Sequence, residues 1–73
     1  MKFTIVEILR ETQSYKFLGG KIDKKESINL FNYFQKKYPH KEIVLFAVPA
    51  HHSLVLYLPI YVQKYLDKKK NYI

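Results

Sequence analysis

The chain has no cysteine, no tryptophan, two glycines and three prolines among its 73 residues. The absence of cysteine excludes disulfides, thiolate metal ligands and a cysteine nucleophile, and is compatible with the reducing cytoplasm, where we expect the protein to act. A core of this size supplies only about 3 to 5 kcal/mol of stability. We therefore expect one domain over residues 1–73 that gains further stability by self-association, as a homodimer.

Arginine and acidic residues are also scarce. The chain has 13 Lys and Arg against 6 Asp and Glu, a net charge of +7, and Arg10 is its one arginine. An AT-rich genome enriches lysine but also glutamate, so the excess of positive charge indicates an acidic partner. Lysine suits phosphate backbones, whereas bidentate recognition of guanine is mostly the work of arginine. The composition therefore predicts anion contact with little sequence discrimination.

Residues 43–62 contain no formal charge. This run is long enough to cross a bilayer as a helix, but its centre holds Pro49, His51 and His52, which are disfavoured in a lipid-facing helix. A kinked buried helix is a second alternative. We favour a β-hairpin with strands at 43–48 and 54–58, and hence no membrane span. The N-terminus meets acidic residues and Arg10 too early for a signal peptide, so no secretory targeting is expected.

The remaining segments predict a second hairpin and two helices. Residues 3–10 and 15–18 have strand composition, with turn residues between them. Asp23 followed by Glu26 is typical of a helix N-terminus, and Pro39 ends that helix. Pro59 suits the first turn of another helix. The sequence therefore predicts an α+β domain of order ββαββα, with a four-stranded, mainly antiparallel sheet and two helices.

The uncharged hairpin is apolar on both faces, and this leaves two arrangements open. If both helices cover one side of the sheet, the other side is an apolar patch of the kind that marks a partner surface. If the helices lie on opposite sides, no patch exists. For the first arrangement, the predicted protein interface consists of Val44, Phe46, Val48, Val55 and Tyr57.

Two groups of lysines are candidate nucleic-acid contacts. Lys21, Lys24 and Lys25 surround a helix N-terminus, whose dipole attracts anions. Lys68, Lys69 and Lys70 form a basic run at the end of the second helix. Tyr15, Phe17, Tyr33 and Tyr57 are candidate base-stacking residues, although we expect most of the aromatic side chains to fill the core.

Catalytic and metal-binding constellations are missing from the sequence. His51 and His52 are adjacent, but neighbouring strand residues point to opposite faces, and His40 lies at the far end of the preceding strand. No carboxylate nearby could orient a catalytic histidine. Gly19-Gly20-Lys21 lacks the spacing of a phosphate-binding P-loop. We therefore expect no enzyme activity, no cofactor and no metal.

The function predicted from the sequence is that of a small basic binding protein that contacts nucleic-acid phosphates with low sequence specificity. The alternative is a regulator or inhibitor of the compact kind that viruses and mobile elements encode, binding a host protein through the apolar sheet face. A third hypothesis is a membrane-associated peptide that uses the uncharged run.

Overall fold

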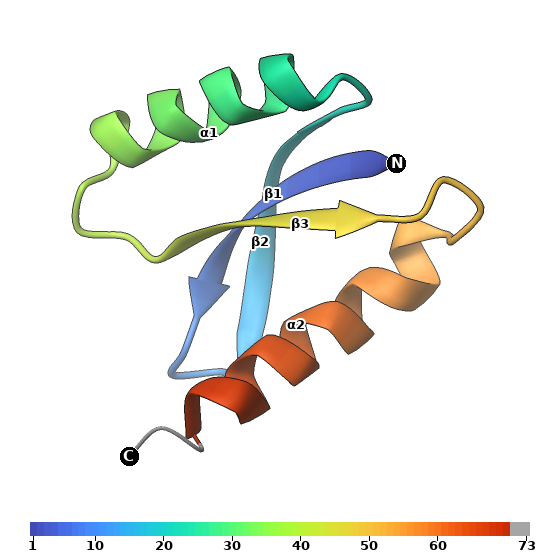
Figure 1. Ribbon diagram of the computed structural model, residues 1–73. Coiled ribbons are helices and arrows are strands. Elements are labelled where there is room, and N and C mark those ends of the chain that lie inside the picture. Colours follow the sequence, from blue (N-terminus) through green and yellow to red (C-terminus); the bar gives the residue numbers. More distant parts are fainter. Residues whose placement is uncertain (71–73) are drawn as a thin grey trace.

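The computed structural model describes residues 1–70, which form three strands and two helices in the order ββαβα (Figure 1). The elements are β1 (Lys2–Leu9), β2 (Ser14–Lys21), α1 (Lys24–Lys37), β3 (Ile43–Val48) and α2 (Leu54–Lys70). The central strand is β1, which pairs antiparallel with β2 on one side and with β3 on the other. The α+β class, the antiparallel sheet and the two helices are thus confirmed.

The predicted fourth strand, and with it the ββαββα order, is wrong. Residues 54–58 form the first turns of α2. The chain turns at residues 49–53, where the amide of His52 donates to the carbonyl of Pro49, and the amide of Tyr57 donates to the carbonyl of Ser53 as α2 begins. Pro59 consequently lies inside the helix and not in its first turn. Because proline has no amide proton, this position lacks one intrahelical hydrogen bond.

The two helices cover opposite faces of the sheet. Ile5 and Val6 are neighbours on β1 and both are completely buried, although consecutive strand residues point to opposite faces. Gly19 pairs with Ile5, and a Cβ at Gly19 would lie 3.2 Å from Cδ2 of Leu30, so α1 packs on the Ile5 side. Figure 1 shows α1 and α2 on either side of the sheet. Of the two arrangements left open, the structure has the one without an apolar sheet face.

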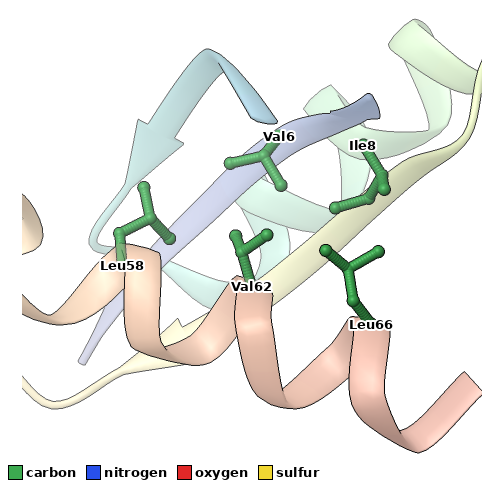
Figure 2. Packing of buried hydrophobic residues seen from close by; sticks show 5 residues of the cluster. All are labelled: Val6, Ile8, Leu58, Val62 and Leu66. Carbon is green, nitrogen blue, oxygen red and sulfur yellow. The ribbon is translucent and has the colours of Figure 1, made fainter. Parts of the chain in front are cut away.

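The side chains between the sheet and α2 form the larger part of the core. Leu58, Val62 and Leu66 lie four residues apart on α2 and point toward Val6 and Ile8 of β1 (Figure 2). These five side chains are all buried, and Tyr15, Val44, Phe46 and Tyr65 pack around them. The four-residue spacing places one face of α2 against the sheet along the described part of the helix.

A polar network joins the ends of three elements on this side. Arg10, just after β1, forms an ion pair with Glu42, just before β3, with 2.7 Å between Nη2 and Oε2. The hydroxyl of Tyr65 on α2 donates to the same carboxylate. Burial, followed by this hydrogen bond, raises the pKa of Tyr65 above its ordinary value. The charge of Glu42 therefore faces groups of the protein itself.

Candidate nucleic-acid interface

Most of the acidic side chains interact within the protein. Glu42 binds Arg10, and Glu7 forms an ion pair with Lys41, with 3.5 Å between Oε1 and Nζ. Asp23 accepts the amide of Glu26, and Asp67 accepts a hydrogen bond from the side chain of Gln63. Among the ion pairs of the described side chains, those of residues 1–68, Lys41 is the only lysine. Lys21, Lys24, Lys25 and Lys36 are exposed and take part in neither ion pair, so their positive charge is available to an external anion.

The helix that carries several of these lysines begins and ends as the sequence predicts. Asp23 is the N-cap of α1, and its carboxylate accepts the amide of Glu26 at 3.0 Å. Ser27 is fully buried and donates its hydroxyl to the carbonyl of Lys24 at 2.6 Å. Tyr38 is the C-cap, directly before Pro39, and its amide donates to the carbonyl of Phe34. These local bonds fix where α1 begins and ends.

The outer side of α1 is polar, basic and free of acidic residues along its centre. Lys25, Asn29, Asn32 and Lys36 are exposed and follow one another at helical spacing. We call these four residues the α1 stripe. With a rise of 1.5 Å per residue, its two lysines are separated by about 16 Å along the helix axis. The stripe thus presents a positive charge at each end and two amide side chains between them.

Aromatic rings and lysines alternate at the C-terminal end of α1. Nζ of Lys37 lies 3.4 Å from the hydroxyl of Tyr33, and this contact raises the pKa of Lys37. Lys37 and Lys41 both lie over the ring of Tyr38, at 5.5 and 4.6 Å from its centroid. The exposed ring of Tyr33 beside Lys37 has the composition of a site for base stacking next to phosphate contact.

The structure brings one of the two predicted lysine groups together. Lys21 ends β2, and Lys24 and Lys25 begin α1, all three exposed. Lys68 is exposed on α2, across the sheet from α1, so it does not extend the same surface. The backbone of Lys69 and Lys70 continues α2, but their side chains lie outside the described part of the structure. Lys36 and Lys37 were not among the predicted contacts, although aromatic and basic residues lie close together in 33–41 of the sequence.

The five residues of the predicted protein interface do not share a surface. Val44 and Phe46 pack beneath α2, and Val48 is completely buried. Val55 and Tyr57 lie on α2 and not on a strand. The sheet face that was expected to meet a partner is instead covered by the chain's own second helix.

His52 and three of the predicted stacking residues, Tyr15, Phe17 and Tyr57, lie outside α1. The ring of His52 stacks on Tyr57 at 4.1 Å between centroids, and its Nδ1 lies 3.3 Å from the hydroxyl of Tyr61. Tyr15 packs against the core, whereas Phe17 is half exposed. Within residues 1–70, no three His, Asp or Glu side chains gather as metal ligands. No helix in the same range combines the length and apolar character needed to cross a membrane.

The protein thus consists of three layers, in which the sheet lies between the two helices. The outer face of α1, which carries the α1 stripe, is basic. Searches of protein-family models, curated proteins and solved structures found no match to the chain.

Proposed function

We propose that the protein is a small non-catalytic binding protein that contacts nucleic-acid phosphates through the outer face of α1 and the adjoining Lys21. The observation that carries the proposal is the α1 stripe, in which exposed Lys25 and Lys36 flank two asparagines without an acidic neighbour in the stripe. Exposed lysines neutralise phosphates as point charges and release the counterions around them. Asparagine amides add hydrogen bonds to sugars or base edges.

The same residues support low sequence specificity. The commonest specific base contact is a bidentate arginine on guanine. Arg10 is the one arginine of the chain, and its guanidinium is bound to the carboxylate of Glu42. The α1 surface therefore offers lysines for the backbone and few groups that discriminate between bases.

The arrangement of the layers favours binding by a helix over binding by the sheet. RNA-binding domains of the open-sheet type stack bases on aromatic residues of an uncovered sheet face. Here both faces are covered, as the complete burial of Ile5 and Val6 requires. An exposed helix face is the geometry that enters a groove of duplex DNA, so we expect duplex DNA to bind at least as tightly as a single strand.

This proposal predicts a steep dependence of affinity on salt. In fluorescence anisotropy with a labelled DNA duplex of random sequence, the protein is expected to bind in the micromolar range or tighter at low salt. Each neutralised phosphate contributes about 0.9 to the slope of log K against log salt, so three or four lysine contacts give a slope of about −3. A second duplex of unrelated sequence should bind within about threefold. Absence of binding at low salt, or a slope near zero, would contradict the proposal.

A second candidate function is that of a regulator that binds another protein, and one observation favours it. The first half of α2 exposes apolar side chains: Val55 is 84%, Leu56 68% and Ile60 48% exposed. Contiguous exposed apolar groups mark protein interaction sites more often than single ones do. The partner surface proposed here is thus on a helix and not on the sheet face expected from the sequence.

Leu56→Asp tests this second candidate, with Gln63→Asp as its control, because both place a carboxylate on an exposed position of α2. The wild-type protein and Gln63→Asp are expected to retain the same partner from nuclease-treated cell lysate in an affinity capture. Leu56→Asp is expected to lose that partner, because a carboxylate cannot be buried in an apolar contact without a large cost. Identical capture by all three proteins would exclude the patch as an interface.

A further inference from the structure

Aromatic and lysine side chains gather at the C-terminal end of α1, where the chain leaves the helix toward β3 (Figure 1). We call this group the Tyr33 cluster, and its members are Tyr33, Lys37, Tyr38 and Lys41. Asn29 of the α1 stripe lies four residues before Tyr33, and residues four apart are neighbours on a helix surface. The cluster therefore adjoins the α1 stripe along its C-terminal half.

Tyr33 is exposed for no reason that the fold supplies. The next residue, Phe34, faces the sheet, since a Cβ at Gly19 of β2 would lie 3.9 Å from its ring. Tyr33 contacts that ring edge to face, at 5.4 Å between centroids, but is itself 53% exposed. Tyrosine is also a weaker helix former than lysine or glutamine. Neither the core nor the helix requires a tyrosine here, and its side chain is accessible to a ligand.

Lys37 is held beside this ring. Its Nζ donates to the hydroxyl of Tyr33 at 3.4 Å and lies 5.6 Å from the centroid of the same ring. An ammonium has three protons, so two are left for another acceptor. Lys37 takes part in neither of the ion pairs among the described side chains, those of residues 1–68. An exposed aromatic ring thus lies next to a positioned, unneutralised cation.

A second cation faces the same place. Nζ of Lys37 and Nζ of Lys41 lie 5.5 and 4.6 Å from the centroid of Tyr38. Glu7 lies 3.5 Å from Lys41 and offsets part of its charge. The two lysines and this one carboxylate leave the cluster with a net positive charge, and Lys37 is the ammonium that is free to meet an anion.

The pairing of a ring with a cation favours an unpaired nucleotide over a base pair. Inside a duplex each base is stacked between its neighbours, and only its edges are open in the grooves. An aromatic side chain can stack only on a base that has left the duplex or was never part of it. Such a nucleotide offers a flat face for the ring and a phosphate for the ammonium.

We propose that the Tyr33 cluster binds an unpaired nucleotide at the end of a duplex that the α1 stripe holds. The base stacks on the ring of Tyr33, and its phosphate contacts the ammonium of Lys37. This inference rests on the proposed nucleic-acid contact of α1 and names the form of the partner, a duplex that continues into single strands.

Three labelled DNAs of one duplex sequence test the inference by fluorescence anisotropy at one low salt concentration. The first is blunt, the second ends in a fork of five unpaired adenine nucleotides on each strand, and the third has the same fork with abasic nucleotides. The abasic fork carries the added phosphates without the bases. The adenine fork is expected to bind about tenfold more tightly than the abasic fork, because stacking on one aromatic ring has this magnitude.

The three DNAs separate this inference from the proposed function. If the blunt duplex binds and the two forks bind equally, the stacking site is overturned and the duplex contact stands. If the adenine fork binds while the blunt duplex does not, the duplex contact of the α1 stripe is overturned and stacking is supported. Binding to none of the three overturns both.

Tyr33→Leu is expected to remove the tenfold preference for the adenine fork, because leucine has no flat face for a base. The ratio of the two fork affinities is compared within each variant, so a change that affects all DNAs cancels. Tyr33→Phe keeps the ring and is expected to retain most of the preference.

Phe17→Leu is the matched control. Phe17 is 52% exposed, as Tyr33 is, but it lies against Leu54 and Val55 of α2 on the other side of the sheet. This variant is expected to keep the full preference for the adenine fork. An undiminished preference in Tyr33→Leu, or its loss in Phe17→Leu alone, would overturn the assignment of stacking to Tyr33.

Discussion

Replacing Leu58 by alanine is expected to lower the free energy of unfolding by about 3 kcal/mol, whereas the same replacement at Leu56 is expected to change it by less than about 0.5 kcal/mol. Leu58 is 3% exposed and packs in the cluster of Val6 and Val62, so alanine leaves a cavity there. Leu56 is 68% exposed and loses little when it is shortened. Both residues lie on α2, so helix propensity changes equally in the two variants.

Urea unfolding followed by circular dichroism measures both effects. The comparison distinguishes a helix from a strand, because a strand at 54–58 would place residues 56 and 58 on the same face of the sheet. The two alanine variants would then lose similar amounts of stability. Since the whole domain holds only about 3 to 5 kcal/mol, Leu58→Ala is expected to be partly unfolded at room temperature. Equal losses at the two positions would contradict the helical assignment of this segment.

The elements with strong local signals were predictable from the sequence. Asp23 at the N-cap and Pro39 after the C-cap fix the limits of α1, because their effects act within a few residues. The turn composition of residues 11–14 likewise predicts the connection between β1 and β2, which the structure has at residues 10–13. In each case the residues that determine where an element begins or ends lie within a few positions of that element.

Residues 54–58 illustrate the opposite case. Leu54, Leu56 and Leu58 alternate as a buried strand does, while Leu54 and Leu58 also fit a helix. Packing favours the helical periodicity over that of a strand, because Leu58, Val62 and Leu66 lie four residues apart and pack together against β1. That contact joins the two ends of the chain, and no local pattern reveals it.

The candidate site was likewise predictable only where its features depend on residues close together in the sequence. The excess of lysine, and its presence at the start of α1, follow from the sequence. Which lysines are available to bind an anion depends on which basic residues pair with acidic residues inside the protein. The pairing of β1 with β3 brings Glu7 to Lys41 and Glu42 to Arg10, and this pairing is not visible in the local sequence. The predicted interface on Val44 and Phe46 failed to form a surface for a related reason, since α2 covers these residues.

Charge reversal of the α1 stripe is the second change with a large expected effect. Lys25→Glu combined with Lys36→Glu is expected to weaken binding to duplex DNA about 30-fold at low salt, or about 2 kcal/mol. The variant loses two phosphate contacts and adds repulsion, and its salt slope should fall by about 1.8. Both positions are exposed, so the fold should remain intact.

The matched control is Lys64→Glu combined with Lys68→Glu on α2. These two lysines are also exposed, and the double variant has the same net charge as the α1 variant. The control carries its changes on the helix across the sheet from α1. Any long-range effect of net charge alone is therefore common to both proteins.

The affinity of these two variants for one labelled duplex, measured by anisotropy at a single low salt concentration, tests the account most directly. We expect the α1 variant to bind about 30-fold more weakly than the wild type and the α2 variant to bind within about threefold of it. Equal weakening of the two variants would show that binding follows net charge and that the α1 stripe is not the interface.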